Sequence, residues 1–232
     1  MRLFEFEVGS EEFRQQEIKK LAVDVWTNCQ PFLKQIKYNP STEDNVKLYR
    51  GQEGGTGVWK GSGYDVLHKV RSDRKPRDTS PKLHRIVNAW MLQKFGWYVR
   101  SEGLFTCGSP GVSKNYGSTC VIYPIGRFQY VWSEKIEDMT ESLGRTTGYS
   151  TEFYDDEKLN QIITDMLENA KWHKNTGLYS CITKKPRTEI TIDVMNYYAF
   201  PVNKLSNNCI QAQDIDWALA DIALGKTQHE TV

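Results

Sequence analysis

The segment "SPKLHRIVNAWMLQKFG", residues 80–96, constrains the fold more than any other stretch of this chain. Ser80 suits the cap of a helix, Pro81 suits its first turn, and Gly96 suits the position just past its end. Between these limits apolar residues recur at helical spacing, at Leu83, Ile86, Val87, Trp90 and Met91. The pattern predicts an amphipathic helix, which must bury its apolar face against another element.

Other segments carry weaker signals of the same kind. Apolar periodicity predicts helices at 10–29, 155–170 and 214–225, the first opening on Ser10 and stopping or bending at Pro31. Segments 45–51, 97–107, 118–133 and 188–200 are rich in β-branched and aromatic residues and predict strands, with one or two in the last segment. The stretch between residues 52 and 80 predicts a long loop, because five of the twelve residues from Gly54 to Asp65 are glycine.

The order of these elements indicates the fold class. Helices and strands follow one another without a regular βαβ alternation, which predicts an α+β fold with a largely antiparallel or mixed sheet. At 232 residues the chain needs a single hydrophobic core. We therefore expect a helical segment over 1–44 packed on one compact domain over 45–232.

Composition disfavours several kinds of partner, metal site and cellular location. The formal net charge is +1, so a nucleic acid or an anionic membrane must be met by a local patch. Five scattered cysteines without a C-x-x-C pair, and four dispersed histidines, disfavour a zinc site and favour a reducing compartment. Acidic residues in "MRLFEFEVGSEEF" disfavour a secretory signal, and no apolar run approaches a membrane span. The expected location is the cytosol or the interior of a particle.

Three motifs stand out together: "LYRG" at 48–51, "EGLFTCGSPGVSKNYG" at 102–117 and "TEITID" at 188–193. In combination they resemble the ADP-ribosyltransferase superfamily, whose members cleave NAD and pass ADP-ribose to an acceptor. The resemblance spans roughly residues 46 to 200 and extends to uncharacterised bacteriophage proteins of this type. It implies a split mixed or antiparallel β-sheet core with flanking helices, NAD as the substrate, and a phage-encoded protein in the host cytoplasm or the virion.

The first motif supplies the expected NAD clamp. Tyr49, Arg50 and Gly51 match the strand-end pattern of the superfamily. A glycine lets a ligand approach the backbone closely, and an arginine offers a rigid fork of donors to phosphate or ribose oxygens. The resemblance therefore places Arg50 in both NAD binding and catalysis.

The middle motif supplies the expected nicotinamide wall. Phe105 and Tyr116 lie eleven residues apart, with Ser113 three residues before Tyr116, as in the polymerase branch of the superfamily. Arg50 instead resembles the arginine-serine-glutamate branch, which has an arginine where the polymerase branch has a histidine. That branch also has a Ser-Thr-Ser turn, of which residues 106–109 match only a part. Within that turn Thr106 is expected to face the arginine. Without the flanking motifs, Phe105 and Tyr116 would be interpreted as core aromatic residues and Ser113 as a helix cap.

The third motif supplies the expected catalytic carboxylate. As nicotinamide leaves, positive charge develops on the ribose, and a carboxylate bonded to the 2′-hydroxyl stabilises it. The resemblance assigns this role to Glu189, with Glu152 as the alternative. Arginine-modifying members carry a second acidic or amide residue two positions earlier, where this chain has Arg187. That departure argues against arginine as the acceptor.

These motifs leave several functions open. The leading interpretation is an NAD-dependent mono-ADP-ribosyltransferase acting on a protein or nucleic acid, with Arg50, Tyr116 and Glu189 lining one cleft. Transfer to water would make it an NAD glycohydrolase, and Arg50 in place of histidine disfavours a polymerase. The alternatives are an inactive virion-associated or binding protein of the same fold, and a nucleic-acid-binding module. Basic stretches at 68–78 and 184–187 suit either NAD phosphates or an anionic acceptor, and they equally suit a solvated surface.

Overall fold

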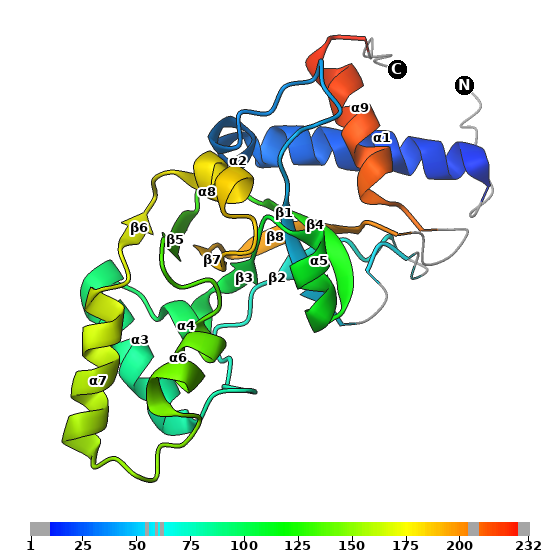
Figure 1. Cartoon of the computed structure of the whole chain (residues 1–232). Coiled ribbons are helices and arrows are strands. Elements are labelled where there is room, and N and C mark those ends of the chain that lie inside the picture. The colour runs from blue at the N-terminus through cyan, green and yellow to red at the C-terminus, as the bar shows by residue number, and fades with distance from the viewer. Residues whose placement is uncertain (1–9, 54–55, 59, 61–62, 204–208, 227–232) are drawn as a thin grey trace. The chain divides into compact units, whose positions relative to one another are not determined.

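A computed structural model describes residues 10–53, 56–58, 60, 63–203 and 209–226 (Figure 1). The acidic N-terminal stretch up to residue 9 and residues 54, 55, 59, 61 and 62 of the predicted loop lie outside these residues. The described residues form an α+β fold, as the order of the elements predicted, and their strands form two antiparallel sheets. Their contacts divide the chain into two compact units. The first unit comprises 1–68, 110–127 and 196–232, and the second comprises 69–109 and 128–195.

The first unit contains a sheet in the order β1-β4-β8-β2. Its strands are β1 (Leu48–Gln52), β4 (Ser118–Pro124), β8 (Asn196–Pro201) and the short β2 (Leu67–Lys69), which ends at the boundary of the unit. In the antiparallel register Tyr49 lies opposite Val121, and Val121 lies opposite Phe200. A helical turn, α5 (Pro110–Ser113), and a 3₁₀ helix, η1 (Lys114–Tyr116), lead into β4.

Two long helices of the first unit pack on each other. The helix α1 (Glu11–Asn28) begins where the Ser10 hydroxyl accepts a hydrogen bond from Phe13 N, and Pro31 lies in the first turn of the next helix, α2 (Gln30–Gln35). Both observations confirm the predicted limits of the first helix. Its partner α9 (Ala212–Ala223) agrees with the predicted C-terminal helix to within two residues.

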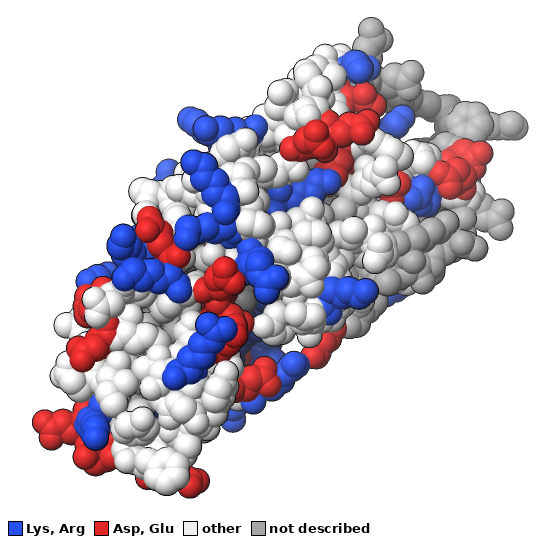
Figure 2. Space-filling view, viewed as in Figure 1, with Lys and Arg blue, Asp and Glu red and all other residues white. Residues whose placement is uncertain are grey.

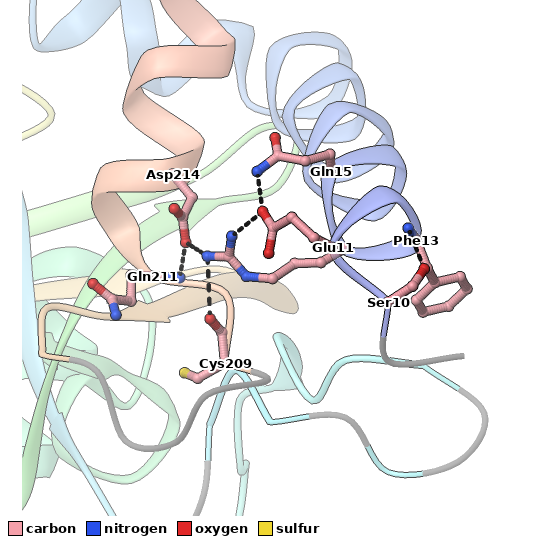
Figure 3. Close-up of polar contacts among 8 residues, drawn as sticks. Ser10, Glu11, Phe13, Gln15, Cys209, Gln211 and Asp214 are labelled. Carbon is pink, nitrogen blue, oxygen red and sulfur yellow. Dashed lines mark hydrogen bonds and ion pairs between the residues drawn. The ribbon is translucent and has the colours of Figure 1, made fainter. Parts of the chain in front are cut away.

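A half-buried arginine links the starts of these two helices (Figure 3). Arg14 donates to Asp214 Oδ2 at 2.6 Å and to the Cys209 carbonyl at 3.5 Å. The same Asp214 oxygen accepts from Gln211 N at 2.8 Å and so also caps α9. One carboxylate therefore serves both the helix cap and the contact with α1.

The second unit contains a sheet in the order β3-β7-β5-β6 and most of the remaining helices. Its strands are β3 (Leu104–Thr106), β5 (Gln129–Ser133), β6 (Trp172–Lys174) and β7 (Ile190–Asp193). Its helices are α3 (Pro81–Phe95), α4 (Val99–Glu102), α6 (Met139–Thr147), α7 (Asp156–Glu168) and α8 (Leu178–Lys184). The apolar faces of α3, α6 and α7 share one core with buried residues of β5 and of the segment 97–99.

The helix α3 confirms the strongest prediction from the sequence. The Ser80 hydroxyl accepts from Leu83 N at 3.2 Å, and Gly96 ends the helix with a left-handed φ of 87°. Leu83, Val87, Trp90 and Met91 are buried, as their spacing predicted, and Ile86 packs against the same core.

The prediction of a strand throughout 97–107 is wrong for residues 99–102, which form α4. Two side chains stabilise this turn: Glu102 accepts a hydrogen bond from Tyr98 N at 3.2 Å, and Asn88 accepts one from Arg100 N at 2.9 Å. Val99 is buried within the turn. Tertiary contacts thus override the strand preference of this segment.

Two segments predicted as strands each divide into two strands that join different sheets. Segment 118–133 forms β4 in the first sheet and β5 in the second, and segment 188–200 forms β7 and β8 in the same way. The contacts therefore group segments that are distant in sequence, and the predicted division at residue 45 stays a prediction. Contacts place helices α1 and α2 in the same unit as β1, β4 and β8. Within that unit β4 pairs with both β1 and β8, although the three strands are distant in sequence.

All five cysteines are free and buried. Among the described residues, His, Cys, Asp and Glu side chains form no group suited to hold a metal ion. Within the same residues, none of the helices has the length and apolar character that crossing a bilayer requires.

Candidate functional site

The structure brings the first two sequence motifs into contact within the first unit. A Cβ added to Gly51 would lie 2.5 Å from the Ser113 carbonyl oxygen and 2.5 Å from the backbone carbon of Tyr116. The space beside Gly51 is therefore filled by backbone of the chain itself, rather than open to a ligand. This close approach explains the glycine and packs the Tyr116 backbone against the residue that follows Arg50.

Arg50 lies in a polar cluster on β1 and β8. Its Nε donates to Gln52 Oε1 at 3.3 Å, and Gln52 Nε2 donates to the Tyr197 hydroxyl at 3.1 Å. Burial lowers the pKa of the Arg50 guanidinium, and the hydrogen-bonding Tyr197 hydroxyl opposes that effect. The His68 ring stacks on the Tyr197 ring at 5.5 Å, and its buried Nε2 has no hydrogen-bond partner among the described residues.

Ser113 and Tyr116 differ in exposure. Ser113 is buried, and its hydroxyl contacts the Pro110 carbonyl at 2.9 Å and the Thr119 hydroxyl at 3.1 Å, so it closes the turn of α5. Ser113 also stands at the N-cap of η1, but its side chain makes no capping hydrogen bond there, so the helix-cap alternative for its hydroxyl stays a prediction. Tyr116 is 49% exposed as a residue, which is inconsistent with a core aromatic residue and consistent with a ring that can stack on a ligand.

Phe105 and Thr106 lie on β3 of the second unit. The guanidinium carbons of Arg74 and Arg100 lie over the Phe105 ring, 4.5 and 4.3 Å from its centroid. The Thr106 hydroxyl donates to the Ile190 carbonyl on β7 at 2.9 Å. Thr106 therefore links two strands of the sheet, and Phe105 belongs to a cationic cluster.

Glu189 lies in the same cluster, immediately before β7, as the sequence predicted. Arg100 Nη1 donates to Glu189 Oε1 at 2.6 Å, and the Thr191 hydroxyl donates to the same oxygen at 3.3 Å. No described residue donates a hydrogen bond to Oε2. The carboxylate is thus held through one oxygen while the other can accept a hydrogen bond.

The electrostatic surroundings of Glu189 are mixed. Burial raises the pKa of its carboxyl group above the ordinary value, and the negative charge of Asp138 adds to that effect. The charges of Arg100 and Arg74 and the Thr191 hydroxyl act in the opposite direction. The side chain is 22% exposed, so solvent or a ligand can reach it.

Arg100 is itself held in place by α3. Asn88 Oδ1 accepts from Arg100 N at 2.9 Å, while Asn88 Nδ2 donates to the Ser101 hydroxyl at 2.6 Å. The His84 ring contacts the same hydroxyl at 3.1 Å. Burial lowers the pKa of His84, and the positive charge of Arg100 lowers it further. Sequence reasoning missed Arg100 because its partner Glu189 is 89 residues away.

The structure therefore brings the predicted site residues together in two groups. Tyr49, Arg50, Gly51, Ser113 and Tyr116 belong to the first unit, and Phe105, Thr106 and Glu189 belong to the second. That Arg50, Tyr116 and Glu189 line one cleft stays a prediction. Glu152, the alternative carboxylate, is exposed in the turn before α7, and Arg187 is exposed and lies 3.6 Å from Glu137.

A separate hollow on the second unit lacks the features of a ligand site. It is open to solvent, has a volume of about 480 Å³ and is lined by Lys82, Arg85, Ile86, Asp156, Glu157 and Asn160. Lys82 and Asp156 form an ion pair of 2.5 Å across it, and none of the predicted site residues lines it.

Comparison with known proteins adds no assignment. The chain matches no protein-family model, no curated protein and no solved structure. The chemistry of the Glu189 cluster is therefore the basis for a functional proposal.

Proposed function

We propose that this protein is an NAD-dependent mono-ADP-ribosyltransferase, in which Glu189 stabilises the positive charge that develops on the ribose. The bond between nicotinamide and ribose breaks, nicotinamide leaves, and the ribose carbon is attacked by a nucleophile of the acceptor. Glu189 Oε2 would accept a hydrogen bond from the ribose 2′-hydroxyl during this step. The resemblance of the three sequence motifs to the superfamily points to the same reaction and to a phage-encoded protein.

The observation that carries the proposal is the asymmetric binding of the Glu189 carboxylate. Two donors, from Arg100 and Thr191, converge on Oε1, and Oε2 lacks a donor among the described residues. A carboxylate oriented in this way needs no reorganisation to accept a hydrogen bond from a substrate. Partial burial strengthens its interaction with a developing cation.

Residues of the first unit would contribute to binding NAD. The exposed ring of Tyr116 suits stacking on nicotinamide, and the Arg50 guanidinium suits a phosphate or ribose oxygen. Gly51 would act indirectly, because its missing side chain allows the Tyr116 backbone to approach β1. In this interpretation Ser113 and Thr106 position backbone rather than contact the substrate.

The test is nicotinamide release from NAD by the full chain. We expect Glu189→Gln to lower the rate by a factor of about 10² or more, because the amide cannot supply a full negative charge. The matched control is Glu152→Gln, which neutralises an exposed carboxylate in the same unit and should leave the rate unchanged. Equal rates for wild type and Glu189→Gln, with both folded, would reject the proposal.

A second candidate, an inactive protein of the same general fold, is favoured by a specific observation. Several predicted NAD contacts already have internal partners: Arg50 bonds Gln52, Thr106 bonds Ile190, and backbone fills the space beside Gly51. This candidate predicts no heat of NAD binding by calorimetry, whereas the transferase predicts binding that Tyr116→Ala weakens.

A further inference from the structure

The segment from Lys69 to Asp78 concentrates positive charge beside the Glu189 cluster. It contains five Lys or Arg residues and two Asp residues, and it has no regular structure after β2 ends. Both acids form exposed ion pairs with their neighbours, Arg71 with Asp73 at 3.3 Å and Arg77 with Asp78 at 3.4 Å. Exposed ion pairs of this kind contribute little to stability, because solvent and salt screen the charges.

Two exposed lysines of this segment make no polar contact with the described part of the chain. The side chains of Lys69 and Lys75 form neither a hydrogen bond nor an ion pair with the described part of the chain. A charged side chain in this state breaks no internal contact when it binds a phosphate, and the main cost is its rotamer entropy.

Arg74 joins this segment to the candidate carboxylate. Arg74 N donates to the Ser101 carbonyl at 3.3 Å, and its Nη1 donates to the Gly103 carbonyl at 3.0 Å. Its guanidinium shares the Phe105 ring with Arg100, which in turn bonds Glu189. The segment is therefore tied to the Glu189 cluster through contacts within one unit.

A second group of cationic residues lies in the five positions that precede Glu189 in the sequence. Lys184, Lys185 and Arg187 are exposed, and Arg187 has its guanidinium within 3.6 Å of Glu137. On the face shown in Figure 2, described Lys and Arg side chains lie among Asp and Glu side chains. Both segments lie close to Glu189 in the structure or in the sequence, the first through Arg74 and the second through the residues that directly precede it.

We infer that these two segments bind the phosphodiester backbone of a nucleic acid and that the acceptor of the proposed reaction is a nucleic acid. The cations of the first segment are spread along ten residues, 69–78, which suits a row of phosphates better than one pyrophosphate. Three of the five are arginines, whose fork of donors matches phosphate geometry. Naming the acceptor rests on the proposed function, whereas the binding itself requires no NAD.

The test measures binding of labelled single-stranded RNA and DNA, each of about 20 nucleotides, to the full chain by fluorescence anisotropy without NAD. With about four phosphate contacts, the logarithm of the association constant should fall against the logarithm of salt concentration with a slope of about −3. The double variant Lys69→Glu/Lys75→Glu should weaken binding at least about tenfold and reduce the slope by about 1.4. The matched control Lys19→Glu/Lys34→Glu changes the net charge equally at exposed helix positions of the first unit and should change binding less than about twofold.

Each result bears on the inference. Absence of salt-dependent binding, or equal weakening by both double variants, would overturn it. Competition by polyglutamate as effective as competition by RNA would overturn it in favour of an acidic protein partner. Glu189→Gln should keep RNA binding while losing nicotinamide release, so failure of the proposed function and failure of this inference give different results.

Discussion

Arg100 Nη1 lies 2.6 Å from Glu189 Oε1, and this contact joins a helical turn to the start of a strand 89 residues later. The arginine is 11% exposed and the glutamate 22% exposed, so the pair is largely shielded from water. The pair sets which carboxylate oxygen remains available and opposes the effect of burial on the pKa of Glu189.

Glu189 should make the stability of the protein depend on pH. Burial raises its pKa above the ordinary value of 4.5, so in the window above 4.5 the folded protein binds a proton that the unfolded chain releases. The free energy of unfolding therefore falls as pH rises through that window. Glu189→Gln removes this titration, so urea unfolding at a series of pH values should show the variant gaining stability relative to wild type with rising pH. A constant difference at all pH values would contradict the raised pKa.

Arg100→Met should shift the pH dependence of nicotinamide release. Without the arginine charge the pKa of Glu189 rises further, and the acidic limb of kcat/KM moves to higher pH. Arg100→Lys keeps the charge and should shift the limb less. A carboxyl ¹³C titration of Glu189 checks the same shift without relying on activity. Identical acidic limbs in wild type and Arg100→Met would exclude Arg100 as a positioning residue.

Tyr116→Ala should separate ligand binding from stability. The residue is 49% exposed, so we expect the free energy of unfolding to change by less than about 0.5 kcal/mol. Loss of stacking worth about 1 kcal/mol should raise the KM for NAD several-fold with little change in kcat. Phe153→Ala, at an 85% exposed aromatic, is the control and should leave KM unchanged. The stacking role fails if both variants behave alike.

Gly51→Ala should be strongly destabilising. The new Cβ would lie 2.5 Å from backbone atoms of Ser113 and Tyr116, which cannot move away as a flexible side chain would. We expect a loss of about 3 kcal/mol in chemical denaturation. Gly126→Ala, where the Cβ meets no atom within 4 Å but φ is +70°, should cost about 1 kcal/mol from backbone strain alone. A smaller loss at Gly51 than at Gly126 would mean that residues 113–116 do not pack on β1.

Arg14→Met should loosen the contact between α1 and α9. The substitution leaves Asp214, whose side chain is 17% exposed, without its ion-pair partner and should cost about 2 kcal/mol. In a double-mutant cycle with Asp214→Asn, the coupling energy should be about 1 kcal/mol, because the Asp214 carboxylate and the Arg14 guanidinium interact directly in the wild type. Strictly additive effects of the two substitutions would show that the ion pair contributes nothing.

Local features account for the predictions that the structure confirms. Ser10, Ser80 and Gly96 mark helix ends through hydrogen bonds or dihedral angles within a few residues, and these depend little on the rest of the chain. The position of Glu189 before a strand was also predictable, because β-branched residues follow it directly.

The sequence by itself determined the fold class, the limits of the main helices and the order of the chemical groups along the chain. The tertiary structure decided that β4 and β5, and likewise β7 and β8, join different sheets, and that Arg100 is the partner of Glu189. The physical reason is that caps and helical periodicity depend on neighbours in sequence. Strand pairing, burial and the pKa of a carboxyl group depend instead on residues that are distant in sequence and adjacent only after folding.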